Sequence, residues 1–314
     1  MRVTQLFWNT REQRLRSLWR LLAHTVIGAA LILAGSIVVA AVLRDAAVAP
    51  IVDRPVQALA IAGSVLIAAR LLDRRPLRDM LATPTVESLR DVVAGCLIGA
   101  SAMLGLVAIL LPAGWAEVSP ALHVTREDMP GFALTISLVG ILYALSGAAE
   151  EMLSRGYHLR NMAEGMGGLF GRRAALIGAV VLSSLVFAGL HLTNQHASAA
   201  AATNIVLGGL WLGLACALTG RLALPIGLHV GWNVAQGPLL GMPISGSRAL
   251  AEVFETRLSG PAGWTGGAFG PEGGLLGSLG ILIGALLTLV WVRTTRGRLT
   301  LHLGLARYRR RARG

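Results

Sequence analysis

Residues 131–160 read GFALTISLVGILYALSGAAEEMLSRGYHLR. The run from 131 to 149 contains no charged residue, and two adjacent carboxylates, Glu150 and Glu151, follow it directly. An apolar run of about 20 residues is long enough to cross the hydrocarbon core of a bilayer. Because an ionisable side chain is costly inside a membrane, two carboxylates at the end of such a run indicate a functional site.

The whole chain has the composition of a membrane protein. Of its 314 residues, 54% are hydrophobic and only 14% are charged, against about 25% charged in soluble domains, and the mean hydropathy is +0.65. We therefore predict an all-α fold, a polytopic transmembrane helix bundle of about eight spans. The candidate spans are 22–43, 55–71, 88–112, 131–152, 174–192, 201–219, 222–240 and 275–293.

The charge pattern predicts the orientation in the membrane. The net charge is +12, the chain has no lysine, and the arginines gather near the two termini and in alternate loops. This distribution follows the positive-inside rule and predicts an even number of spans, with both termini on the cytoplasmic side of the cell (inner) membrane. Because membrane topology explains the arginines, we expect no nucleic-acid partner. The lysine-free composition, rich in arginine, alanine and glycine, suggests a bacterial source.

Three regions follow from these spans. Residues 1–130 form an N-terminal arm and three spans, residues 131–240 form a core of four spans, and residues 241–314 form an external loop, the last span and a basic cytoplasmic tail. Within the loop, the glycine-rich stretch 260–277 follows no predicted strand and lacks the GK[ST] of a phosphate-binding loop. We interpret this stretch as a flexible loop.

Helical spacing separates the roles of the two carboxylates. Glu151 and Arg155 are four residues apart, on one helix face and in the order that favours an ion pair. Glu150 points about 100° away from that pair. One carboxylate is therefore expected to be structural and the other to be free for proton transfer.

Two further apolar runs carry histidines. Phe187 and His191 share a face in FAGLH, and His229 and Asn233 share a face in HVGWN. Either histidine alone is more often a hydrogen-bonded core residue than a catalyst. A glutamate, two histidines and an asparagine in three spans together indicate chemistry rather than packing.

In their order, these motifs resemble a known family. EEMLSR (150–155) fits EExxxR, FAGLH (187–191) fits FxxxH and HVGWN (229–233) fits HxxxN. The three motifs are similar to those of the CPBP intramembrane proteases, the group that includes the CAAX prenyl endopeptidase Rce and bacterial bacteriocin-immunity and bacteriocin-processing (Abi) proteins. The resemblance covers about residues 130–240 and marks 131–240 as a CPBP-type catalytic core.

The resemblance implies an intramembrane endopeptidase acting on a peptide or membrane-protein substrate. Glu150 would be the base that activates a water, and His191 would help to hold that water. His229 and Asn233 would stabilise the oxyanion. Supporting residues would orient these groups; they are Glu151, Arg155 and Phe187.

Metal dependence stays open at this stage. The family is discussed both as metalloproteases and as metal-independent glutamate proteases. If a metal is bound, Glu150, His191 and His229 are its candidate ligands and zinc is the candidate metal. Because the sequence has no HExxH motif, we favour the metal-free chemistry.

Two other classes of function use similar residues. A non-catalytic membrane scaffold or immunity protein would use the cluster for binding, and a proton-coupled transporter would use it as a proton relay. Against the transporter, the sequence shows neither repeated halves nor paired broken helices.

The predicted span bounds contain one conflict. Straight helices with these bounds would place Glu150 near the cytoplasmic end of its span and His191 near the outer end of the next. Either the span of Glu150 continues toward residue 160, or the span of His191 starts lower or tilts.

Overall fold

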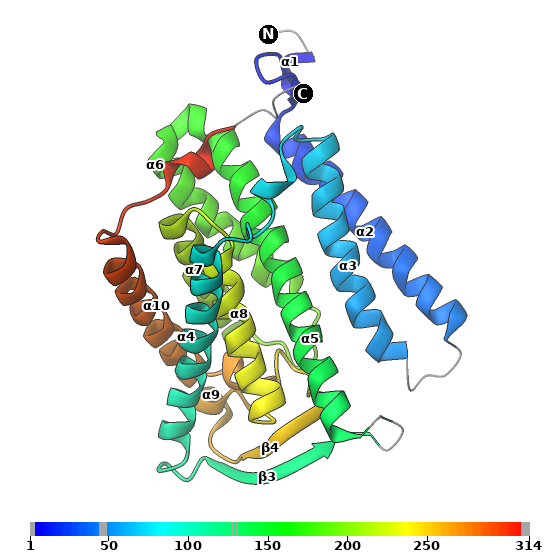
Figure 1. The fold of residues 1–314 in the computed structure, drawn as a ribbon, viewed down its shortest axis with the longest axis vertical. Helices are drawn as coiled ribbons and strands as arrows, with labels where there is room; N and C mark the ends of the chain where they lie inside the picture. Colours follow the sequence, from blue (N-terminus) through cyan, green and yellow to red (C-terminus); the bar gives the residue numbers. More distant parts are fainter. Residues whose placement is uncertain (1–3, 44–48, 127–128, 130, 309–314) are drawn as a thin grey trace.

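The structure is a bundle of long helices with a small sheet at one end (Figure 1). This computed structural model describes residues 4–43, 49–126, 129 and 131–308. The mostly helical fold confirms the predicted class. The long helices are α2 (Ser17–Val42), α3 (Ala49–Leu71), α4 (Val86–Leu110), α5 (Phe132–Glu151), α6 (Leu159–Leu190), α7 (Ala199–Thr219), α8 (Ala223–Val234) and α10 (Leu275–Arg296).

Shorter elements connect or extend these helices. Two are π-helical, η2 (Met152–His158) and η3 (Ala235–Leu239). Two small antiparallel sheets pair β1 (Trp8–Asn9) with β2 (Arg14–Leu15) and β3 (Ala116–Val124) with β4 (Ala251–Leu258). The remaining short helices are α1 (Thr4–Phe7), η1 (Leu77–Asp79), α9 (Ala262–Thr265), η4 (Gly267–Phe269), η5 (Pro271–Gly273) and η6 (Leu303–Ala306).

The chain is a multi-pass membrane protein. Within the described residues, six helical stretches are long and apolar enough to cross a bilayer. The longest, Phe132–Leu190, covers 59 residues, and Gly171 interrupts it with φ 75° and ψ 157°. Gly178 lies against the side chain of Met166, a contact that a straight helix would not allow over twelve residues. The count of eight spans stays a prediction, because Phe132–Leu190 is one stretch by this criterion and α8 with η3 is shorter than a full span.

The conflict between the predicted spans of Glu150 and His191 is resolved by the length of the helix that carries Glu150. Helical backbone continues from α5 through η2 and into α6 as far as Gly171, where the chain turns back. Glu150 therefore lies in the middle of a long arm, and the returning arm ends at His191. This is the first of the two predicted alternatives.

The closest helix contact joins α4 to α8 through four glycines. Gly95 and Gly99 of α4 face Gly227 and Gly231 of α8, four residues apart in each helix. A Cβ atom at Gly231 would lie 2.2 Å from the backbone oxygen of Cys96. Small residues at this spacing let two membrane helices touch through their backbones. The contact fixes α8, which carries His229 and Asn233.

We predict that Gly99→Ala destabilises the protein. The added Cβ would lie 2.3 Å from the backbone oxygen of Leu228, so the two helices must separate, at a cost of about 1–3 kcal/mol. Gly105→Ala is the matched control, because Gly105 lies on the same helix and a Cβ there meets no atom within 4 Å. Thermal unfolding in detergent checks this, and equal stability of the two variants would contradict the assigned contact.

The two described ends of the chain lie together at the arginine-rich end. Glu164 forms ion pairs with Arg14 at 2.8 Å and with Arg75 at 2.6 Å, and the guanidinium of Arg14 stacks on the ring of Tyr308 at 3.3 Å. Burial alone would lower the pKa of Arg75, but the carboxylates of Glu164 and Asp73 outweigh it and raise that pKa above its ordinary value. A chain that crosses the membrane an even number of times has both of its ends on the same side, as these two described ends are.

At the opposite end of the bundle, residues 260–277 are not the flexible loop that the sequence analysis predicts. This stretch contains α9, η4 and η5 and leads into α10, while β4, just before it, pairs with β3. The sequence analysis did not predict β3, which has Pro120 at its centre, a residue that is unfavourable within a strand. Together these segments close the end of the bundle beneath the cavity described next.

Candidate active site

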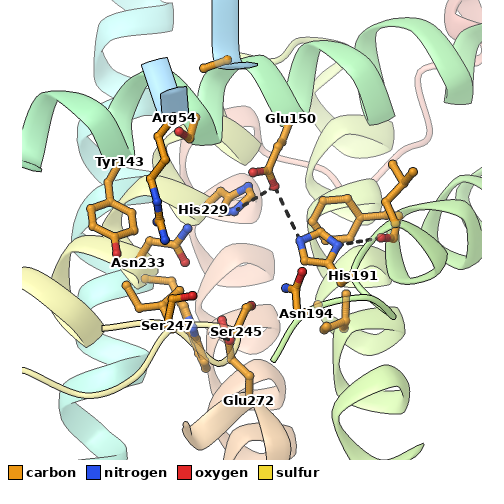
Figure 2. Close-up of a pocket in the computed structure, with 18 of the residues that line it drawn as sticks. Arg54, Tyr143, Glu150, His191, Asn194, His229, Asn233, Ser245, Ser247 and Glu272 are labelled. Carbon is orange, nitrogen blue, oxygen red and sulfur yellow. Dashed lines mark hydrogen bonds and ion pairs between the residues drawn. The ribbon is translucent and has the colours of Figure 1, made fainter. Parts of the chain in front are cut away.

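The four residues predicted to be catalytic line one cavity of about 820 Å³. Glu150 comes from the end of α5, His191 directly follows α6, and His229 and Asn233 lie one turn apart on α8. Figure 2 shows Glu150 above the two histidines, with Asn233 to one side. Residues separated by up to 83 positions in the sequence thus meet in one place.

Glu150 faces both histidines through the same carboxylate oxygen. Its Oε2 lies 3.9 Å from Nε2 of His191 and 3.8 Å from Nε2 of His229. The Glu150 side chain is 29% exposed, toward the cavity. Both separations exceed the range of a direct hydrogen bond, about 2.7–3.2 Å, so a small molecule such as water is needed to link these groups.

The Nδ1 atom of each histidine has a hydrogen-bond partner in the protein. Nδ1 of His191 lies 2.8 Å from the backbone oxygen of Phe187, and Nδ1 of His229 lies 3.0 Å from Oε1 of Glu151. A carbonyl oxygen only accepts, so Nδ1 of His191 donates and, in the neutral ring, its Nε2 carries a free lone pair. These bonds fix the direction in which each Nε2 points.

Glu151 and Arg155 form the ion pair that their spacing predicts. Arg155 donates to Oε1 of Glu151 at 2.7 Å, and both side chains are fully buried. A second guanidinium nitrogen of Arg155 donates to the backbone oxygen of Gly209 at 2.8 Å. Since the same Oε1 accepts from His229, the buried pair holds a ring that lines the cavity.

Phe187 packs among these groups. Its ring centre lies 4.6 Å from that of His191 and 6.1 Å, edge to face, from that of His229. The guanidinium of Arg155 stands over the same ring at 4.8 Å. Phe187 therefore excludes water from the rear of the site and restricts both imidazoles.

Asn233 lines the cavity one turn beyond His229 (Figure 2). Its side chain forms no hydrogen bond with any residue that the structure describes. The amide is free to donate to a bound group.

Sequence reasoning missed the π-helices and the polar floor of the cavity. Each π-helix directly follows the α-helix of a site residue, η2 after α5 and η3 after α8, and such segments often occur at functional sites. Pro238 gives one local signal, in η3. The polar residues TNQ (193–195), shortly after His191, and the single charged residue in 260–277 were signals for the floor. The added lining residues include Arg54, Tyr143, Asn194, Ser245, Ser247 and Glu272.

The fit of a metal to this site is poor. Zinc bonds of about 2.0–2.2 Å in tetrahedral geometry bring ligand atoms to roughly 3.4 Å from one another, closer than Glu150 lies to either histidine. Among the described residues, no group of three histidine, cysteine, aspartate or glutamate side chains is arranged to hold a metal ion. We therefore derive no step through a metal.

Comparison with known proteins matches the part of the chain that carries the site. Residues 132–235, about a third of the chain, match the family model of Rce1-like type II CAAX prenyl endopeptidases. Comparison with curated proteins and with solved structures gives no match. The predicted resemblance is confirmed: the Rce1-like type II CAAX prenyl endopeptidase model matches residues 132–235, which include the four cavity-lining candidates.

Proposed function

We propose that this protein is an intramembrane endopeptidase in which Glu150 activates a water to hydrolyse a peptide bond. The observation that carries the proposal is the position of Glu150 Oε2, which faces Nε2 of both histidines at 3.8 and 3.9 Å. The family match supports a CAAX-protease-type endopeptidase in general.

In the attacking step, the water donates one hydrogen bond to Nε2 of His191 and the other to Oε2 of Glu150. Glu150 removes that second proton as the water oxygen bonds to the carbonyl carbon of the substrate. His191 orients the water because its own proton is held on Nδ1 by the Phe187 carbonyl.

The oxyanion that forms is stabilised from the α8 side. Both ring nitrogens of His229 face carboxylates, Glu151 through Nδ1 and Glu150 through Nε2. When the ring carries a proton on both nitrogens, Nδ1 donates to Glu151 and Nε2 is free to donate as well. Nε2 of His229 and the free amide of Asn233 then donate to the oxyanion. When the carbon–nitrogen bond breaks, Glu150 returns its proton to the leaving amine.

Substrate and orientation follow from the membrane setting. We propose that the arginine-rich end is cytoplasmic in the cell (inner) membrane of a bacterium. A peptide leader or a membrane-protein segment suits a cavity among apolar helices. Because many bacteria do not prenylate proteins, a prenylated substrate is not required.

Purified protein in detergent micelles tests the proposal. A mixed pool of apolar peptides is incubated with wild type and with Glu150→Gln, and new peptide N-termini are identified by mass spectrometry. We expect cleavage by wild type alone, unchanged by the zinc chelator 1,10-phenanthroline. If the chelator abolishes cleavage and added zinc restores it, the metal-free step is contradicted. If wild type and Glu150→Gln give the same products in equal amounts, the proposal that Glu150 catalyses cleavage is contradicted.

Asn233→Ala is expected to lower kcat by about 10²–10³-fold with little change in KM. The amide donates mainly to the oxyanion, which exists only in the transition state. Steady-state kinetics on a peptide cleaved from the pool measures both constants. Asn9→Ala is the control, because Asn9 lies in β1 and does not line the cavity. A kcat within threefold of wild type for Asn233→Ala would remove this residue from the mechanism.

A further inference from the structure

The glycine-rich stretch 260–277 carries a single charged residue, Glu272, and the steps above do not use it. Glu272 lies in η5 and lines the floor of the cavity, across from Glu150 and the histidines (Figure 2). Its position outside the family match, residues 132–235, makes it a feature of this chain's own C-terminal part.

The backbone around Glu272 is fixed by close glycine contacts. Gly266 and Gly270 have φ of 80° and 99°, a conformation that L side chains rarely adopt. A Cβ at Gly270 would lie 2.0 Å from the backbone oxygen of Pro243, and one at Gly266 would lie 1.7 Å from the backbone oxygen of Gly270. The glycines thus form a tight support that presents Glu272 to the cavity, which explains their density in the sequence.

The carboxylate itself is also held in one orientation. Oε2 of Glu272 accepts from the backbone N–H of Ser245 at 2.7 Å and from its hydroxyl at 2.8 Å. Oε1 forms no hydrogen bond or ion pair with any residue in the described part of the chain. Burial raises the pKa of Glu272, while the hydrogen bonds from Ser245 oppose that change. A fixed, half-buried carboxylate thus offers one free acceptor to the cavity.

An extended peptide in this cavity needs such acceptors. A bound extended peptide exchanges the water on its backbone N–H groups for protein acceptors, and a buried N–H left without an acceptor costs about 1–3 kcal/mol. The oxygen of Glu150 is engaged with the attacking water on the opposite wall. Glu272 is therefore placed to meet the substrate backbone from the other side.

We propose that Oε1 of Glu272 accepts a hydrogen bond from a backbone N–H of the bound substrate and so sets the depth at which the scissile bond lies beneath Glu150. The proposal rests on the proposed function and names a substrate-binding residue for it. Glu272 is a positioning residue here, with no part in proton transfer.

Binding to an inactive background tests this role. The protein carries Glu150→Gln so that no peptide is consumed, and a dansyl-labelled octapeptide of alternating leucine and alanine is titrated against tryptophan emission. Trp211 and Trp232, which line the cavity, supply the energy transfer. The same peptide with its backbone amides N-methylated lacks the N–H donors. We expect N-methylation to weaken binding about tenfold to a hundredfold, the range for a hydrogen bond to a charged group.

Adding Glu272→Ala should remove most of that difference, because the acceptor is gone. Glu272→Gln, which keeps an acceptor oxygen without charge, should retain part of it, and Glu117→Ala should retain all of it. Glu117 is an exposed residue of β3 outside the cavity. If Glu272→Ala does not fold, Ser245→Ala, which removes one of the two donors to Oε2, should reduce the difference partially.

An N-methylation effect of the same size with and without Glu272, or none at all in the Glu150→Gln protein, would overturn the proposal. Wild-type cleavage of the unmethylated peptide is measured separately. Because binding is read in an inactive protein, a failed binding result and a failed protease assay remain distinguishable.

Discussion

Replacing Glu150 by glutamine is expected to lower kcat by about 10²–10⁴-fold, the usual contribution of a general base. Glutamine has the shape of glutamate but cannot accept the proton of the attacking water. KM should change little, since the Glu150 oxygen contacts the water rather than the substrate backbone. Steady-state kinetics on a peptide cleaved by wild type measures the effect.

Two companion variants make this result specific. Glu150→Asp keeps the carboxylate but withdraws it by one methylene group, so it should retain more activity than Glu150→Gln. Glu117→Gln removes an exposed carboxylate outside the cavity and should match wild type. Activity of Glu150→Gln above a tenth of wild type would mean that another group takes the proton.

Arg155→Met is expected to have the largest effect on stability. It leaves Glu151 fully buried without its cation, and breaking a buried ion pair from one side costs about 3–5 kcal/mol. Activity should fall as well, because Glu151 also holds Nδ1 of His229. Denaturant unfolding in micelles gives the free energy, and Arg70→Met is the control, since Arg70 is exposed on α3.

The double variant separates the two roles of this pair. Glu151→Leu with Arg155→Met removes both charges, so most of the lost stability should return. Activity should stay low, because Nδ1 of His229 then lacks its acceptor. If the double variant is as unstable as Arg155→Met, or if Arg155→Met is as stable as the control, the pair does not hold the site as described.

The sequence predicts the positions of the helices well and the turns between them poorly. Apolar runs of membrane length mark the helices because burial in lipid imposes length and composition together. The predicted spans 131–152 and 174–192 placed the connection before residue 174 but did not locate the turn at Gly171, since glycine also occurs within membrane helices. The glycines of α4 and α8 did carry a signal, GxxxG in both GCLIG (95–99) and GLHVG (227–231).

Within the site, the motif residues were predictable and the cavity floor was not. His191 and His229 stand in motifs whose i, i+4 spacing keeps each pair on one helix face, so local periodicity points to them. Glu150 was marked instead by its position at the end of an apolar run, next to the Glu151–Arg155 pair. Glu272 meets these residues only through the tight turns of a glycine-rich segment, whose contacts with Pro243 and Ser245 are tertiary. No period in the sequence encodes such contacts.

The most direct test of the central claim is a comparison of membrane-protein N-termini in bacterial cells that express wild type or Glu150→Gln at matched protein levels. The account predicts new N-termini with wild type alone, which would establish proteolysis, name the substrate and require Glu150. If the two profiles coincide while peptides cleaved in vitro are present in the cells, the protease account fails. A non-catalytic scaffold or a proton relay through Glu150 and the two histidines would then take its place.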